Sequence, residues 1–318
     1  MWGQISKIMI EVKNLTKQFG PITAIRDVSF HVKKGEILGF LGPNGAGKTT
    51  TIRILTGLFP ATSGSAHVAG FDVFDESIEV RRRLGYLPEN VPVYNEMPVT
   101  AYLKFAASIK GIAARNITKE VAKVLDQCGL TQVRNRIIAN LSKGFRQRIG
   151  IAQAMLFDPQ VLILDEPTIG LDPKQVTEIR KLIMGFAGEK TVILSSHILP
   201  EVSMMCGRVA IINNGHIVAV DTPERLAGRR ASKVFLEIKG PEAEITSRLG
   251  TIPGVRSIYS EFDQETGIGR YTVETPEETK IRDSLSRSVV NAGWPLLEMR
   301  TIRPTLEDIF LRLVTRER

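Results

Sequence analysis

The segment GPNGAGKTT, at residues 42–50, decides the fold of this chain. Its glycines, its lysine and the threonine that follows occupy the fixed positions of a phosphate-binding loop. Glycines let the backbone curl so that several N–H groups converge on a phosphate, while Lys48 adds a positive charge and the Thr49 hydroxyl can bind Mg²⁺. The apolar run 37–41 before the loop is typical of a buried strand, and a helix is expected from Lys48.

An ordinary glycine-rich turn is the alternative interpretation of this segment. The position of the loop between a buried strand and a helix argues against that alternative, because phosphate binding requires both neighbours. The residues expected to contact the phosphates are Gly42, Pro43, Asn44, Gly45, Ala46, Gly47, Lys48, Thr49 and Thr50.

A second apolar run, at 161–164, ends in the adjacent carboxylates Asp165 and Glu166. Asp165 is expected to hold a metal ion or its water, and Glu166 to polarise an attacking water molecule. An acidic pair at a strand end is usually only part of a turn, so this interpretation depends on the phosphate-binding loop.

The segment LSKGFRQR, at 141–148, is expected to begin a helix with Ser142 as its N-cap and Gly144 in its first turn. The free N–H groups and partial positive charge at the start of a helix suit a γ-phosphate. A plain helix cap is the alternative.

Hydrophobic patterning predicts an α/β core with an inserted helical subdomain at about 98–157. Two alternating segments from Ile8 onward are expected to pair antiparallel, whereas the runs 161–164 and 191–195 flank a predicted helix, as in a parallel sheet. Asn214-Gly215 between two apolar runs predicts a tight hairpin. The helical spacing predicts two helices in the insert, one carrying Tyr102, Phe105, Ala106 and Ile109 and the other Val121, Val124, Leu125 and Cys128.

The tail from about residue 230 alternates in the order β-α-β-β-α-β, which predicts a small ferredoxin-like α+β domain. A last amphipathic helix is expected from Pro304, with Leu306, Ile309, Phe310 and Leu313 on one face. We therefore divide the chain into an ATPase-type domain at 8–228 and an accessory domain at 229–318.

The 318-residue chain has ordinary globular proportions, with 43% hydrophobic and 24% charged residues. Its net charge of +8 fits nucleic acid, an anionic membrane surface or a basic exterior, but short clusters such as Arg81–Arg83 lack the interleaved aromatics of a single-strand platform. No apolar run approaches the roughly 20 residues of a membrane span, and the start lacks a secretory pattern. Two distant cysteines argue against disulfides or a zinc site.

Taken in order, these segments resemble the nucleotide-binding subunit of an ABC transporter, over about residues 8–225. In that family a signature loop of one protomer closes over the ATP held by the phosphate loop of the other, and LSKG at 141–144 stands at the signature position. The resemblance implies a phosphate-loop ABC-ATPase fold with a mixed sheet and an antiparallel part. It also implies ATP and Mg²⁺ as cofactors and a homodimer as the active unit.

The resemblance assigns further residues. Phe19 resembles the aromatic that stacks on adenine, with a buried core phenylalanine as the alternative. His197 resembles the switch histidine that contacts the γ-phosphate and the catalytic centre, although a histidine at a strand end is more often structural. The segment 170–172 resembles a loop through which protomers contact each other, with a helix cap as the alternative.

The sequence departs from the family pattern at three positions. Glu89 stands where the family usually has a metal-binding glutamine, and a carboxylate can also bind Mg²⁺. Lys143 and Phe145 replace the usual glycine and glutamine of the signature, whereas Ser142 and Gly144 are retained. We expect hydrolysis to survive these changes.

The sequence is also similar to exporter ATPases of the drug, polysaccharide or gliding-motility kind. The similarity lies in LGYLPEN at 84–90, in the trailing domain and in LEDIFL at 306–311. Those ATPases pair with separately encoded membrane permeases. The stretch 90–97, with Val93 and Tyr94, is then the expected groove for a cytoplasmic helix of the permease, and a simple surface loop is the alternative. The expected location is the cytoplasmic face of the cell membrane, peripherally bound, and no nucleic-acid partner is expected.

Two other functions stay open at this point. A soluble, non-transport ABC ATPase that acts on nucleic acid or ribosomes usually carries tandem nucleotide domains or a long coiled coil, and neither is found in this sequence. A regulatory module, in which ATP controls assembly and hydrolysis is weak, fits the altered signature and the tail domain.

Overall fold

The computed structural model describes residues 7–228, 232–275 and 278–302. The chain divides into two compact units, residues 1–222 and 223–318, and each is described by itself. The division lies slightly before the boundary expected at 228, because the short helix α8 (Pro223–Gly228) is grouped with the second unit.

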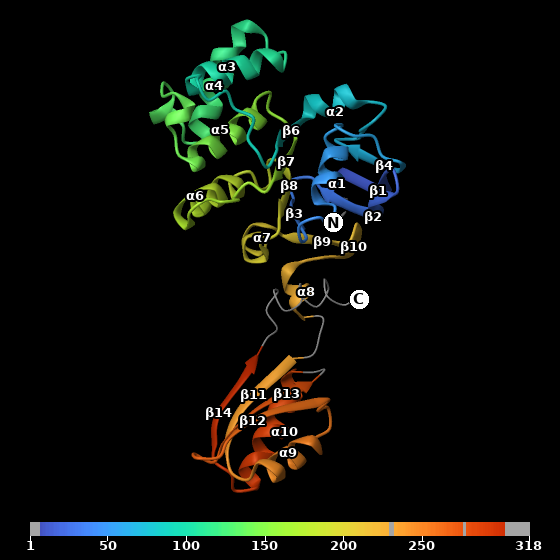
Figure 1. Cartoon of the computed structure of the whole chain (residues 1–318), viewed down its shortest axis with the longest axis vertical. Coiled ribbons are helices and arrows are strands. Elements are labelled where there is room, and N and C mark those ends of the chain that lie inside the picture. The colour runs from blue at the N-terminus through green and yellow to red at the C-terminus, as the bar shows by residue number, and fades with distance from the viewer. Residues whose placement is uncertain (1–6, 229–231, 276–277, 303–318) are drawn as a thin grey trace, which may run out of the picture. The chain divides into compact units, whose positions relative to one another are not determined.

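A six-stranded sheet forms the centre of the first unit (Figure 1). Its strands, in spatial order, are β10 (His216–Asp221), β9 (Arg208–Asn213), β3 (Ile37–Leu41), β8 (Thr191–Ser196), β7 (Val161–Asp165) and β6 (Leu84–Leu87). All neighbours from β9 to β6 are parallel, and β10 returns antiparallel through the predicted Asn214-Gly215 turn. Every residue of β3, β7 and β8 is buried, which explains the apolar run within each strand.

A separate antiparallel sheet packs against the same core. Its order is β2 (Ile22–Lys33), β1 (Ile8–Phe19), β4 (Ser63–Val68) and β5 (Phe71–Asp72), so the expected antiparallel pair is confirmed. Helix α1 (Lys48–Leu55) adds Ile52, Ile54 and Leu55 to the core that these strands share with β3.

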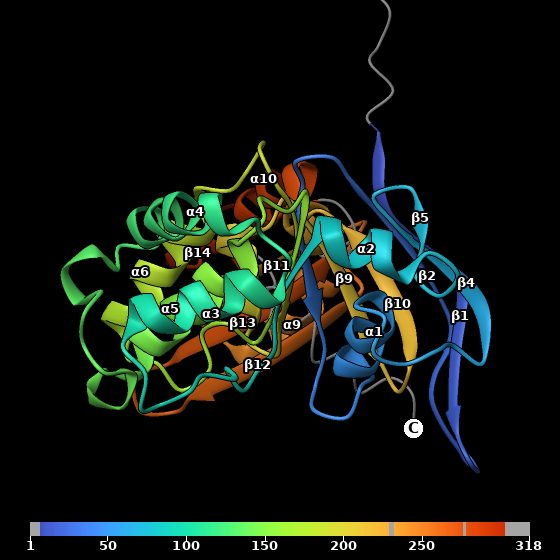
Figure 2. The same cartoon turned by 90° about the horizontal axis from the view of Figure 1, so that it is seen from above.

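The helical insert contains α3 (Val99–Ile109), α4 (Ala114–Gln127) and α5 (Lys143–Met155), which lie together on the side away from β1, β2 and β4 (Figures 1 and 2). Both predicted helices are present, and α4 buries Val121, Val124 and Leu125. In α3, Phe105 and Ile109 are 40% and 69% exposed. Leu103 and Ala107 are buried beside Tyr102 and Ala106, so the buried stripe is displaced by one residue from the set that the spacing picks out.

The remaining helices of the first unit are α2 (Ser77–Arg83), α6 (Pro173–Met184) and α7 (Leu199–Met205), with single 3₁₀ turns at Thr131–Val133 and Ile138–Asn140. Both cysteines are buried, and burial raises the pKa of each thiol. No helix within the described ranges is long and apolar enough to cross a membrane.

The second unit has the predicted β-α-β-β-α-β order. It consists of β11 (Ser232–Lys239), α9 (Glu242–Gly250), β12 (Ser257–Asp263), β13 (Ile268–Thr275), α10 (Glu278–Asn291) and β14 (Leu296–Ile302). The antiparallel sheet has the order β12-β13-β11-β14, and its core joins Leu236 and Tyr271 to Ile245 of α9 and Leu285 of α10. The helix predicted from Pro304 lies outside the described residues.

A partly buried lysine joins the ends of two helices in the insert. Lys110, at the end of α3, donates hydrogen bonds from Nζ to the carbonyls of Gln153, Ala154 and Leu156 at 2.9, 3.3 and 3.3 Å. The last carbonyls of a helix have no partner within the helix, so Lys110 satisfies the end of α5. Burial lowers the pKa of this lysine from 10.5 to about 8.

The stability of the insert should therefore depend on pH. Between about pH 8 and 10.5 the unfolded chain binds a proton at Lys110 that the folded chain has released, so the free energy of unfolding should rise with pH in this window. Lys110→Met removes that contribution. Urea denaturation at pH 7.5, 9 and 10 should show the wild-type protein gaining stability relative to Lys110→Met, and a constant difference would contradict the expectation.

Candidate functional site

A cleft of about 410 Å³ lies beside the carboxyl ends of the parallel strands, where β3 and β7 lead into their loops. We call it the Lys48 cleft. Its lining residues are Ala24, Pro43, Asn44, Gly45, Gly47, Lys48, Thr49, Thr50, Glu89, Glu166, Ile169 and His197. The structure thus brings together most of the predicted phosphate loop with Glu89, Glu166 and His197, which come from distant parts of the sequence.

The loop at 42–50 leaves the start of α1 open. Gly47 has φ 107°, and a Cβ there would lie 2.6 Å from Ile25, so only glycine fits this position. Helix α1 begins at Lys48 with no side-chain cap and no acidic residue in its first turn. The first N–H groups of a helix have no partner within it, so this end is suited to an anion.

Lys48 connects the loop to the acidic side of the cleft. Its Nζ donates hydrogen bonds to the carbonyls of Gly42 at 2.8 Å and Pro43 at 3.3 Å, and lies 3.5 Å from Glu166 Oε1. The side chain is almost fully buried. An ammonium group is therefore held at the position where the loop, the cleft and Glu166 meet.

Glu166 and His197 form a direct pair. His197 Nδ1 lies 2.9 Å from Glu166 Oε2, so this carboxylate contacts the histidine through one oxygen and Lys48 through the other. Glu166 has φ 49°, a left-handed conformation that is uncommon for a residue other than glycine. Such strained positions persist only where neighbouring contacts hold them.

Asp165 lies beneath the cleft and is buried, so it does not line the surface. Ser195 Oγ donates to Asp165 Oδ1 and accepts the backbone N–H of Glu166 at 2.9 Å. Burial raises the pKa of the Asp165 carboxyl; the Ser195 hydrogen bond opposes this rise, whereas the charges of Glu166 and Glu89 add to it. Several carboxylates therefore share a small region with one lysine.

The other predicted site residues lie elsewhere. Gly42 and Ala46 belong to the loop but do not line the cleft. Phe19 ends β1 and is 45% exposed, with its ring edge-on to Phe59 at 5.9 Å. This exposure excludes the alternative of a buried core phenylalanine.

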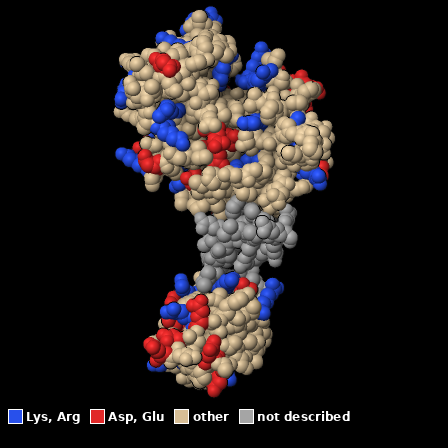
Figure 3. Space-filling view, in the orientation of Figure 1, with Lys and Arg blue, Asp and Glu red and all other residues tan. Residues whose placement is uncertain are grey.

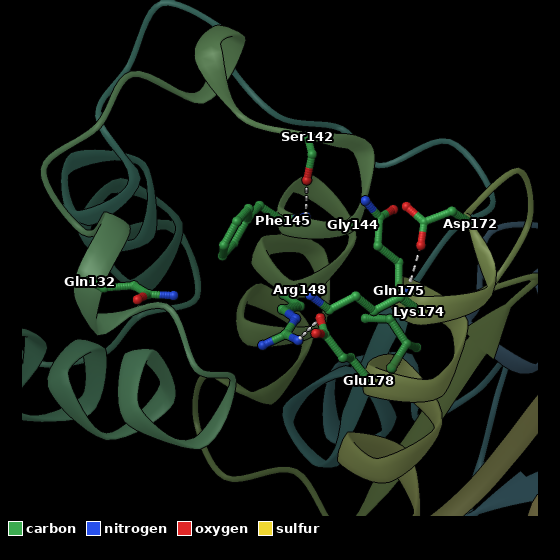
Figure 4. Close-up of a pocket in the computed structure, with 10 residues that line it drawn as sticks. Gln132, Ser142, Gly144, Phe145, Arg148, Asp172, Lys174, Gln175 and Glu178 are labelled. Carbon is green, nitrogen blue, oxygen red and sulfur yellow. Dashed lines mark hydrogen bonds and ion pairs between the residues drawn. The ribbon is translucent and has the colours of Figure 1, made fainter.

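Ser142 and Gly144 line a different hollow, of about 370 Å³, between α5 and α6 (Figure 4). Ser142 caps α5 by accepting the N–H of Phe145 at 3.4 Å, as predicted. Asp172 caps α6 in the same way through Gln175, so the helix-cap interpretation of this aspartate is confirmed. Within one chain, the start of α5 and the Lys48 cleft are separate sites.

Sequence reasoning missed three contributors. Ala24 and Ile169 line the cleft but carry no motif. Ser195 was expected only as the end of a strand, although a signal was present. The runs 161–164 and 191–195 are predicted strands that flank a helix, and the carboxyl ends of parallel strands lie at the same edge of a sheet. The register pairs Asp165 with Ser195 directly.

The fold and the cleft together define a phosphate-loop NTPase, with a parallel sheet, an open helix start and an acidic pair at the adjacent strand end. The family model for ABC transporters matches residues 25–169. A linearmycin resistance ATP-binding protein of Bacillus subtilis is 30% identical over 312 residues, covering 97% of this chain and 99% of the relative. A bacitracin transport ATP-binding protein of Bacillus licheniformis is 33% identical over 311 residues, covering 96% and 97%.

Solved structures agree with these relatives. An ATP-binding subunit of an ABC transporter is 30% identical, covers 70% of this chain and 92% of that chain, and has a TM-score of 0.62. The chain belongs to the family of ABC transporter ATP-binding proteins. It binds and hydrolyses ATP, and this hydrolysis powers transport by a separately encoded membrane permease.

Ser195→Ala should destabilise the first unit. It leaves Asp165 Oδ1 and the Glu166 N–H without their buried partner, at a cost of about 1–3 kcal/mol. Ser203→Ala is the control, because the partner of the Ser203 hydroxyl among the described residues is a carbonyl of its own helix. Urea denaturation should show a clearly larger loss for Ser195→Ala, and equal losses would contradict this role.

Proposed function

We propose that Glu166, oriented by His197, polarises the water that attacks the γ-phosphate of ATP in the Lys48 cleft. The 2.9 Å contact between His197 Nδ1 and Glu166 Oε2, beside the ammonium of Lys48, is the observation that carries this proposal. A carboxylate with one oxygen fixed by a histidine can align a water molecule and accept its proton. The two residues are the proposed catalytic pair.

The phosphate loop is proposed to bind the triphosphate through its backbone. The uncapped start of α1 presents N–H groups to the cleft, and residues 42–50 surround them. Two of the three N–H donors of Lys48 bond to the carbonyls of Gly42 and Pro43, so a phosphate oxygen can accept the third or displace one of these carbonyls. The exposed ring of Phe19, held edge-on to Phe59, is the proposed stacking surface for adenine.

Thr49, Glu89 and Asp165 are the proposed ligands of Mg²⁺. The described residues contain no group of three His, Cys, Asp or Glu side chains that could hold a metal alone. Magnesium usually takes one or two carboxylates together with phosphate oxygens and water, so this donor set fits the ion when nucleotide is bound. Asp165, Glu166 and Glu89 place several carboxylates near this position, which suits a cation, and the ion would neutralise charge that develops on the phosphates.

A homodimer around two ATP molecules is proposed as the active unit. Ser142 and Gly144 lie at the start of α5, outside the Lys48 cleft of their own chain. The start of α5 is suited to an anion but does not face the Lys48 cleft of its own protomer. This supports the proposal that it contacts the phosphates of ATP held in the Lys48 cleft of a second protomer. ATP-driven closure of this dimer would then move the permease.

An aromatic surface supports permease binding by residues 90–97. Tyr94 is 55% exposed, and its ring lies 5.5 Å from that of Phe105 and 6.2 Å from that of Tyr102. The Tyr102 hydroxyl lies 2.9 Å from the carbonyl oxygen of Pro92 and 2.6 Å from Gln153 Oε1, so it links this loop to α5. Exposed aromatic groups of this kind mark interaction sites, so the exposure of Phe105 extends the groove expected from the sequence.

We further propose an exporter bound peripherally at the cytoplasmic face of the cell membrane. The bacitracin transport and linearmycin resistance relatives support export, while the permease would select the cargo. On the face seen in Figure 3, basic and acidic side chains are interspersed over the first unit, which gives no support to a nucleic-acid partner. The second unit is proposed to be an accessory, regulatory domain.

Replacing the proposed catalytic carboxylate tests the function. Glu166→Gln keeps the size of the side chain but removes its negative charge, so steady-state ATP hydrolysis should fall at least about a hundredfold. ATP binding, followed with a fluorescent analogue, should persist, and size-exclusion chromatography with ATP and Mg²⁺ should show more dimer than the wild-type protein. Undiminished hydrolysis in this variant would refute the assignment.

The permease surface is tested separately. Tyr94→Ser and Phe105→Ser should each reduce the share of protein retained on washed membranes of the native cell severalfold, because they remove exposed aromatic area from the groove. ATP hydrolysis by the purified variants should be unchanged. Tyr259→Ser, at an exposed tyrosine of the second unit, is the control. Equal retention of all three variants would exclude this surface.

A further inference from the structure

Residues 165–168, which include Glu166, are held by hydrogen bonds to a second segment, residues 195–201. Ser195, His197 and Glu201 follow one another from β8 into α7, and each bonds to the segment 165–168. Ser195 holds Asp165 and the N–H of Glu166, and His197 contacts the Glu166 side chain. The contact between Glu201 and Thr168 is the one that the proposed chemistry does not use.

Glu201 is a buried carboxylate that accepts a hydrogen bond from a hydroxyl group. Its Oε2 accepts a hydrogen bond from Thr168 Oγ1 at 2.5 Å, and both side chains are buried. Within the described ranges, no lysine, arginine or histidine forms an ion pair with Glu201. Burying a carboxylate without a cation is costly, and the position of Glu201 in the first turn of α7 offsets part of that cost.

Thr168 stands where it can control the backbone of Glu166. Ile169 donates its N–H to the Glu166 carbonyl at 3.2 Å, and Leu171 donates to the Thr168 carbonyl at 3.2 Å, so the residues after Glu166 form a tight turn. Glu166 itself has the left-handed φ of 49°. Ser195 fixes this conformation on one side of Glu166, and Glu201 fixes the turn on the other side through Thr168.

We infer that Glu201 is a positioning residue for ATP hydrolysis. By bonding to Thr168, it keeps the turn after Glu166 in register with the helix that follows His197, so the Glu166 carboxylate meets the histidine. This inference rests on the proposed roles of Glu166 and His197. Glu201 contacts neither residue and does not line the Lys48 cleft, so its effect must pass through Thr168.

The variants below separate the effect of losing the hydrogen bond between Glu201 and Thr168 from the effect of losing the negative charge of Glu201. Glu201→Ala and Thr168→Val each remove the contact and should lower kcat about tenfold, while KM for ATP should change less than about twofold, because small displacements of catalytic groups slow chemistry more than binding. Glu201→Gln keeps an oxygen that accepts the Thr168 hydroxyl, and Thr168→Ser keeps the hydroxyl. Both should recover most of the wild-type kcat.

Two further variants complete the experiment. The double variant Thr168→Val/Glu201→Ala should be no slower than the slower single variant, because both changes remove one shared contact. Glu189→Ala, at an exposed glutamate of the same unit, should have wild-type kinetics. Thermal unfolding of each variant shows whether it is folded at the assay temperature, and if Glu201→Ala is unfolded, Thr168→Val and the two conservative variants decide.

Four outcomes would each overturn the inference. The first two are a wild-type kcat in Glu201→Ala and a Glu201→Gln variant as slow as Glu201→Ala. The others are a KM that rises as much as kcat falls and additive losses in the double variant. Its failure is distinct from failure of the proposed function. If the inference alone is wrong, Glu166→Gln still abolishes hydrolysis, whereas if the proposed function is wrong, Glu166→Gln hydrolyses ATP whatever the Glu201 variants do.

Discussion

The parallel register between β7 and β8 is the constraint on which the rest of the site depends. It pairs Asp165 with Ser195, so the acidic strand end and the segment that leads to His197 leave the sheet side by side. The hydrogen bonds of Ser195, His197 and Glu201 to residues 165–168 all follow from that pairing. The register itself depends on two fully buried apolar strands, because a parallel strand covered on both faces has little freedom to shift.

Much of this architecture could be predicted from the sequence because its signals are local. The glycine pattern at 42–50, the Asn214-Gly215 hairpin and the β-α-β-β-α-β tail each depend on neighbouring residues, and each is found. The face of α3 could not be predicted in the same way. Tyr102, Phe105, Ala106 and Ile109 have suitable spacing, but the choice between Phe105 and Leu103 depends on what packs against the helix. Spacing alone does not contain that information.

In the candidate site, too, residues in local motifs could be predicted, whereas residues that act through distant contacts could not. Lys48, Asp165 and Glu166 could be named because their motifs are continuous in sequence, whereas Ser195 and Glu201 act through contacts between segments about 30 residues apart. Their spacing in sequence is no signal, since a hydrogen bond between distant segments exists only once the sheet has formed. A parallel-sheet prediction with a definite register would have found Ser195. Glu201 also requires the path of α7, which no local pattern specifies.

The partners of Lys48 have a consequence for which molecules can enter the cleft. Its ammonium already has two carbonyls and a carboxylate within 3.5 Å, so any ligand that draws it away must offer more than those groups do together. An uncharged nucleoside brings no negative charge to this ammonium. A chain of adjacent phosphates brings several negative oxygens, so the resting loop favours a polyphosphate over a neutral ligand.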